Sequence, residues 1–284
     1  MVTRTYRDSL FRFLFGRSEH KDWLLSLYNA LNNSNYTNPE EIELTTIDNV
    51  IYLGLRNDVS FIIGDDLMMV EHQTTPSKNM SIRFLLYYAK ILEGYLQKRD
   101  IDLHQYSSIP LPNPRFIVFY NGSQETGEQN EEYLSVHFSS SSNVELRVEF
   151  FNINKGMNDS LKKGCKVLEE YCWVNDRIGY YRATMTLEDA FEKMYDEIPK
   201  GFVICPLIQK HKAEVKGVIL ETFDKERFGK TMFESGVEQG ISQGIELERR
   251  IIIRNMIEKG FTVEDIMKCT NLSKEEVEEV INQS

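Results

Sequence analysis

Residues 58–73, DVSFIIGDDLMMVEHQ, carry the clearest indication of the fold. Two strand-like runs, 58–63 and 67–73, flank a short polar stretch that begins with Gly64 and Asp65. This pattern is typical of a β-hairpin with a tight turn. Because both runs are apolar on both faces apart from a few carboxylates, we expect the hairpin to lie in a buried sheet.

The pairing of the two strands decides which polar side chains meet. The shortest, two-residue loop places Asp58 opposite Glu71 and Arg56 opposite Gln73, and paired residues share a face, with Cβ atoms about 4.5–5.5 Å apart. Two carboxylates so close in a buried sheet are destabilising unless something neutralises them. A divalent cation would do so, since carboxylates supply part of the oxygen shell that Mg²⁺ or Mn²⁺ prefers. Such a metal can activate a water for attack on a phosphodiester.

Two alternatives remain open from the residues alone. Asp58 could be a strand-end residue in solvent, with Glu71 an exposed residue paired with Lys or Arg. A three-residue loop would instead place Asp58 opposite His72 and turn Glu71 to the other face of the sheet.

The remaining sequence alternates between helical and extended patterns, and then becomes helical. Apolar spacing predicts two short helices over 8–33, interrupted at Gly16, and a long helix over 79–99. We expect extended segments at 41–53, 115–121 and 144–153, with loops at 107–114 and 121–132. From 159 the pattern is helical, with breaks near Asn175, Pro199 to Gly201, and Gly260.

Strands early and helices late predict an α/β fold with a mixed sheet flanked by helices, followed by a helical C-terminal region. The predicted divisions are a core over 1–155, a helical extension packing on it over 156–228, and a tail over 229–284.

Composition excludes several classes of protein. The 284 residues include 33 Lys plus Arg and 44 Asp plus Glu, a net charge of −11, so the protein cannot coat nucleic acid through bulk charge. A polyanion must meet a local site, with help from a metal. No apolar stretch is long enough for a membrane span and no secretory signal is seen, which predicts a cytoplasmic protein without a membrane partner. The four cysteines and five histidines lack the spacing of a zinc site, and buried free thiols are expected.

Four segments resemble a known family when they are taken in order: RDSLFRFLF at 7–15, NDVSF at 57–61, VEHQ at 70–73 and SIRFLLYYAKILEGYL at 81–96. Together they are similar to the recombination-promoting nuclease and putative transposase family of the PD-(D/E)XK nuclease superfamily. In that superfamily an Asp on one strand and a Glu-x-Lys on the next bind Mg²⁺ and activate water, and this family commonly has Glu-x-Gln.

The resemblance implies roles for individual residues. Asp58 and Glu71 take the places of the metal-binding catalytic carboxylates, Gln73 takes the place of the Lys, and His72 occupies the variable position. Gln73 departs from the superfamily pattern, since an amide can orient a water or a phosphate but supplies no positive charge. Either another cation substitutes for it, or the site is slow.

The helix after the hairpin adds candidates for substrate binding. Arg83, Tyr87 and Lys90 stand on one side of it, and we expect Arg83 or Lys90 to contact a phosphate or to orient the acidic residues. The alternative is a solvated edge with an aromatic core contact. Asp8 matches an acidic position at the head of the family's first helix and is an additional candidate metal ligand; as an N-cap it needs no such role.

The tail has two sequence features. Gly236, Gly240 and Gly244 recur every four residues, which favours a close helix crossing over a flexible linker and suggests a homodimer. The last 25 residues are typical of helix, turn, helix, with Thr262 and Ser273 as N-caps. The excess of acidic residues in this tail argues against DNA reading and favours packing or protein interaction.

Taken together, the sequence predicts a Mg²⁺-dependent (or Mn²⁺-dependent) DNA endonuclease of low sequence specificity, linked by resemblance to recombination or mobile and phage DNA. The alternative is a weakly active or inactive nuclease-fold protein that acts through protein interactions of its helical tail.

Overall fold

The structure is a computed structural model that describes residues 6–45, 57–217, 219–220, 248, 251–270, 272 and 277. The chain divides into two compact units, Met1–Asp224 and Lys225–Ser284. Each unit is considered by itself below.

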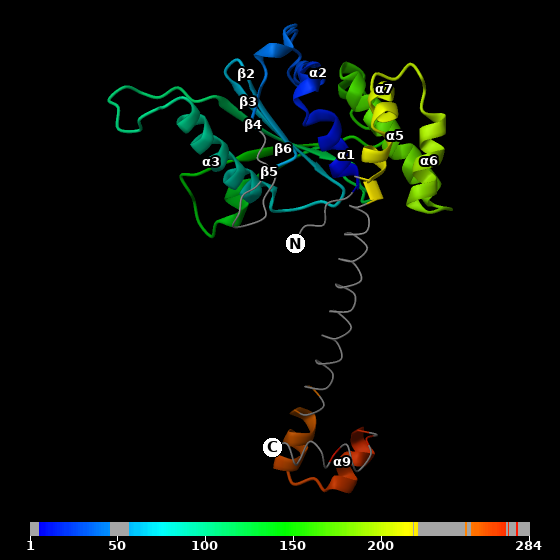
Figure 1. Cartoon of the computed structure of the whole chain (residues 1–284). Coiled ribbons are helices and arrows are strands. Elements are labelled where there is room, and N and C mark those ends of the chain that lie inside the picture. The colour runs from blue at the N-terminus through cyan, green and yellow to red at the C-terminus, as the bar shows by residue number, and fades with distance from the viewer. Residues whose placement is uncertain are drawn as a thin grey trace. The chain divides into compact units, whose positions relative to one another are not determined.

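The first unit is built on a six-stranded mixed sheet with the order β1-β2-β3-β4-β6-β5 (Figure 1). The strands are β1 (Glu43–Leu44), β2 (Val59–Ile63), β3 (Asp66–Gln73), β4 (Asn113–Tyr120), β5 (Gln129–Tyr133) and β6 (Arg147–Asn152). The pairs β3–β4 and β4–β6 are parallel, and the three other pairs are antiparallel. The α/β fold class with a mixed sheet is therefore confirmed.

The hairpin register agrees with the two-residue loop. Pairs run from Ile63 with Asp66 to Val59 with Val70, so Gly64 and Asp65 form the loop. Gly64 adopts a φ of 55°, which glycine tolerates at no steric cost. The alternative three-residue loop is wrong.

Helices cover both faces of the sheet (Figure 1). Helix α3 (Met80–Lys98) packs on one face, where Leu67 and Met69 of β3 and Phe116 of β4 join its apolar side. The other face, with Met68 and Val70 of β3, packs into a larger cluster that includes residues of the remaining helices of this unit. Those helices are α1 (Tyr6–Phe15), α2 (Lys21–Asn32), α4 (Asp159–Gly164), α5 (Lys166–Arg182), α6 (Leu187–Glu197) and α7 (Cys205–Lys210).

Most predicted elements are found, with two differences and one part that lies beyond description. Strand β5 falls in a predicted loop, because its sequence QNEEY is polar and mostly exposed at the sheet edge and shows no apolar alternation. The predicted break at Asn175 is wrong, since Asn175 lies fully buried within α5, where packing overrides its low helix propensity. Of the predicted extended segment 41–53, positions 46–53 lie outside the described residues.

The cysteines are all free. Cys165, Cys172 and Cys205 are buried, as expected, whereas Cys269 is exposed. Burial raises the pKa of Cys165 to about 11 and that of Cys172 to about 12, so neither thiol is an activated nucleophile.

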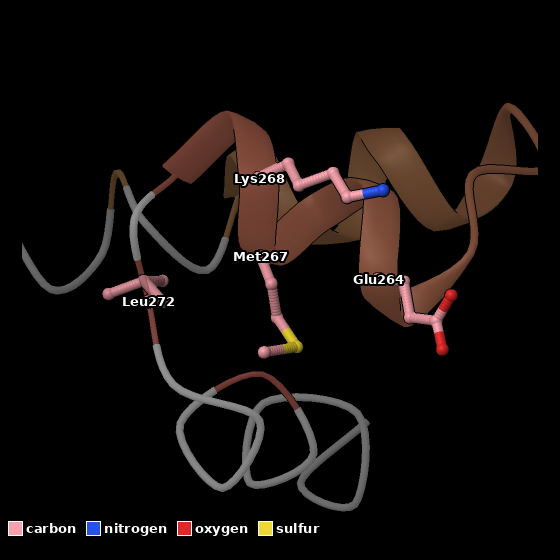
Figure 2. A pocket seen from close by; sticks show the side chains of 4 residues that line it. All are labelled: Glu264, Met267, Lys268 and Leu272. Atoms are coloured by element: carbon pink, nitrogen blue, oxygen red, sulfur yellow. The ribbon is translucent and has the colours of Figure 1, made fainter.

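The second unit contains a helical segment at 251–258 and helix α9 (Val263–Thr270). The Thr262 hydroxyl accepts from the Asp265 amide at 3.2 Å and the Asp265 carboxylate accepts from the Thr262 amide at 3.1 Å, which confirms Thr262 as an N-cap. Figure 2 shows an open pocket of this unit, lined by Glu264, Met267, Lys268 and Leu272.

The remaining features of the tail are not part of the described chain: Gly236, Gly240, Gly244 and Ser273 lie outside it. Within the described residues, no helix combines the length and the apolar character needed to cross a membrane.

Candidate active site

Asp58 and Glu71 meet at the open end of the hairpin. Backbone pairing stops at Val59 and Val70, and beyond it side chains continue the contacts between the strands. The Asp58 amide donates to Glu71 Oε1 at 2.9 Å, and the His72 amide donates to Asp58 Oδ2 at 2.9 Å. Asp58 is 2% exposed and Glu71 is 1% exposed. The alternative that places both carboxylates in solvent is therefore wrong.

The alternation of side chains assigns each polar residue of β3 to a face. Leu67 and Met69 pack toward α3, so Glu71 and Gln73, which follow in the same period, lie on the α3 face. Asp58 lies opposite Glu71 in the continued register and shares that face. Met68 and Val70 pack toward α1 and α5, so the side chain of His72 lies on the other face.

Arg83 of α3 binds the buried carboxylate. Its Nη2 donates to Glu71 Oε2 at 2.8 Å and to Tyr87 Oη at 3.0 Å. Burial lowers the pKa of Arg83, but the charge of Glu71, followed by Tyr87 and Asp58, outweighs burial and raises this pKa above its ordinary value. Arg83 thus remains charged and orients Glu71, which is one of the two roles expected for it.

Tyr87 completes this contact as a neutral hydroxyl. Burial, followed by the charge of Glu71, raises the pKa of Tyr87 to about 12. Lys90 is different: its ammonium binds Glu93 at 2.5 Å, and about half of each side chain is exposed. The structure therefore brings Arg83 and Tyr87 to the carboxylates and places Lys90 in a surface ion pair, as in the solvated-edge alternative.

Gln73 ends β3 on the same face as Glu71 and is 8% exposed. The neighbouring ends of β3 and β4 approach closely, because a Cβ on Gly122 would lie 1.9 Å from the carbonyl oxygen of Thr74. The cation that Gln73 cannot supply is present nearby, on Arg83. Since Arg83 comes from the helix and not from the strand, the spacing of Glu-x-Gln gave no signal of it.

Asp8 and His72 form a second buried pair, on the opposite face of β3. Asp8 lies inside α1, which includes Tyr6, so the N-cap interpretation is wrong. Its Oδ1 is 2.7 Å from His72 Nδ1, and His72 is fully buried. Sequence reasoning placed His72 at a variable position and missed this contact; its only signal was that Asp8 and Phe11 recur at helical spacing on the buried side of α1.

The donor set is suited to a hard divalent cation held by few protein ligands. Within the described chain, no group of three or more His, Cys, Asp or Glu side chains is arranged to hold a metal ion. Mg²⁺, however, is often bound through one or two carboxylates, with water and phosphate oxygens completing its shell. Asp58 and Glu71 fit that description, since each carboxylate oxygen that accepts one hydrogen bond retains another lone pair.

No protein-family model, curated protein or solved structure matches the chain. The resemblance to the nuclease family therefore depends on the short motifs quoted above.

Proposed function

We propose that the protein is a Mg²⁺- or Mn²⁺-dependent DNA endonuclease of low sequence specificity, with a PD-(D/E)XK-like core. The observation that carries the proposal is the pair of almost fully buried carboxylates, Asp58 and Glu71, which share one face at the end of the hairpin. Buried carboxylates are unusual unless they are paired or bind a metal. The order of the family-like motifs supports the choice of a phosphodiester as substrate.

The residues of the site divide the work in this proposal. Asp58 and Glu71 would hold the metal, which would supply a polarised phosphoryl oxygen and an activated water. Arg83 holds Glu71 in place and limits the negative charge that an approaching phosphate meets. Gln73 is placed to orient a water or a phosphate oxygen through its amide, and the neutral Tyr87 hydroxyl keeps the guanidinium aligned.

A plasmid-nicking assay tests the function directly. We expect supercoiled plasmid to become nicked and then linear with Mg²⁺ or Mn²⁺, and to stay intact with a chelator. Calorimetric titration of Mn²⁺ should reveal binding that is lost when Glu71 is replaced by Gln. Cleavage that is equally fast in the chelator would contradict the role of the metal.

A second function is favoured by one observation. The guanidinium of Arg83 already neutralises Glu71, so that carboxylate has a partner in the protein without any metal. A nuclease-fold protein that has lost catalysis and acts through protein contacts of its helical tail would have this arrangement. Absence of Mn²⁺ binding, together with absence of nicking, would favour this alternative over the endonuclease.

We also propose that the protein is a cytoplasmic homodimer that binds DNA, since two sites related by a two-fold axis can cut both strands of a duplex. The dimer rests on the spacing of Gly236, Gly240 and Gly244. Replacing Gly240 by Leu should weaken it by about 1 kcal/mol or more through overpacking. Light scattering measures the result.

The matched control for this substitution is Gly94→Leu, on α3, where an added Cβ meets no atom within 4 Å. We expect the control to keep the wild-type mass. A monomeric wild type removes the dimer, and a dimer that tolerates Gly240→Leu removes the glycine spacing as its cause.

A further inference from the structure

The buried pair of Asp8 and His72 is connected to the candidate metal site through the backbone of β3. Asp8 Oδ1 lies 2.7 Å from His72 Nδ1 on one face of the sheet. The amide of the same His72 donates to Asp58 Oδ2 at 2.9 Å. One residue thus receives a contact from α1 through its side chain and fixes a candidate ligand through its main chain.

The His72 ring is fixed from several directions. Phe11 of α1 stacks on it with ring centroids 6.0 Å apart, and Tyr171 of α5 meets it edge-on at 5.8 Å. The Tyr171 hydroxyl in turn donates to the Arg7 carbonyl at 3.0 Å, which ties α5 to α1. A ring enclosed in this way has little rotational freedom, so its position is set by the two helices.

The charge of Asp8 acts within this enclosure. Burial, followed by the negative charge of Asp8, raises the pKa of Tyr171 well above its ordinary value. His72 Nε2 has no hydrogen-bond partner among the described residues, whereas Nδ1 faces the carboxylate. The tautomer that fits carries its proton on Nδ1 and donates it to Asp8, which leaves Nε2 as a bare acceptor.

We propose that Asp8 and His72 are positioning residues, which hold the end of β3 so that the His72 amide fixes the carboxylate of Asp58. The pair lies across the sheet from Glu71 and acts on the site only through the strand. Asp8 is thereby assigned a role other than that of a metal ligand. The metal consequence of this proposal rests on the proposed function; the structural consequence does not.

The chain offers a matched control at the other end of the same strand. The Tyr28 hydroxyl of α2 donates to Asp66 Oδ2 at 2.6 Å, so it also anchors β3 to a helix, at the first residue of the strand. Tyr28→Phe removes one anchoring contact of β3, as Asp8→Ala does, but far from Asp58.

The first experiment measures amide hydrogen exchange by NMR on the metal-free full chain. In Asp8→Ala we expect the His72 amide to exchange at least about tenfold faster than in the wild type, relative to the Met69 amide of the same strand. Tyr28→Phe should leave this ratio unchanged. Asp8→Asn, which keeps an acceptor for Nδ1, should fall between the wild type and Asp8→Ala.

The second experiment measures Mn²⁺ affinity by calorimetry. Loss of an outer contact that orients a ligand typically weakens metal binding by about 10–100-fold, and we expect a loss of that size in Asp8→Ala and none in Tyr28→Phe. His72→Asn, whose amide can donate near the place of Nδ1, should retain more affinity than His72→Leu.

Each outcome bears on a different statement. An unchanged His72 exchange ratio in folded Asp8→Ala overturns the positioning role. If Asp8→Ala does not fold, Asp8→Asn and His72→Asn give the same decision, and wild-type behaviour of both overturns it. A wild type that binds no Mn²⁺ refutes the proposed function, while the exchange ratios still test the positioning.

Discussion

Replacing Asp58 by Asn should lower metal-dependent plasmid cleavage by at least about 10²-fold, the scale on which removal of one group that acts directly on the reacting atoms is felt. Asn keeps the volume of the side chain and an oxygen that can accept from the His72 amide, which Asp58 Oδ2 now does at 2.9 Å. Only the negative charge is lost. A fall in activity would therefore report on the charge that holds the metal, and not on damage to the hairpin.

Asp58→Ala should be equally inactive but less stable. Alanine leaves the buried His72 amide without its acceptor, and an unsatisfied buried donor costs about 1–3 kcal/mol. Relief of repulsion between Asp58 and Glu71 does not offset this cost, because Arg83 already attracts both carboxylates. Thermal unfolding of the two variants measures the difference.

The control for both is Asp66→Asn. It removes one carboxylate from the same hairpin, but Asp66 binds Tyr28 at the turn end of β3. We expect wild-type cleavage from Asp66→Asn. Pure Asp58→Asn protein that cleaves at the wild-type rate would place the activity elsewhere in the chain.

The hairpin shows why part of the site was accessible from sequence. A side-chain period of two and a two-residue loop determine which residues of the two strands share a face, so Asp58 and Glu71 could be paired without coordinates. The helix after β3 has a similarly regular period, which placed Arg83 and Tyr87 on one side. These are local rules, and each needed only the residues of one hairpin or one helix.

The contact between Asp8 and His72 depends on a different kind of information. The two residues are brought together by the packing of α1 on one face of the sheet, and no local period relates them. The strand β5 escaped prediction for a related reason, since its polar residues owe their extended form to pairing with β6. Contacts decided by tertiary packing leave little trace in a single sequence.

Replacing Arg83 by Met should destabilise the fold on the order of 3 kcal/mol, as expected when one partner of a buried ion pair is removed. The guanidinium donates to Glu71 Oε2 at 2.8 Å, and Glu71 is 1% exposed. Methionine fills the apolar part of the space but supplies no charge. Because a buried carboxylate that loses its cation tends to take up a proton, the deficit should be largest near neutral pH and should shrink at acidic pH.

Denaturant unfolding of the wild type and the variant at several pH values measures this loss, and Lys90→Met on the same helix is the control. Lys90 pairs with Glu93 at the exposed surface, where an ion pair contributes about 0.5 kcal/mol or less. The double variant Arg83→Met with Glu71→Gln should recover much of the stability, because neither charge is then buried without the other. A single Arg83→Met variant as stable as Lys90→Met would mean that Arg83 is free to serve substrate alone, and its ion pair with Glu71 would have no structural weight.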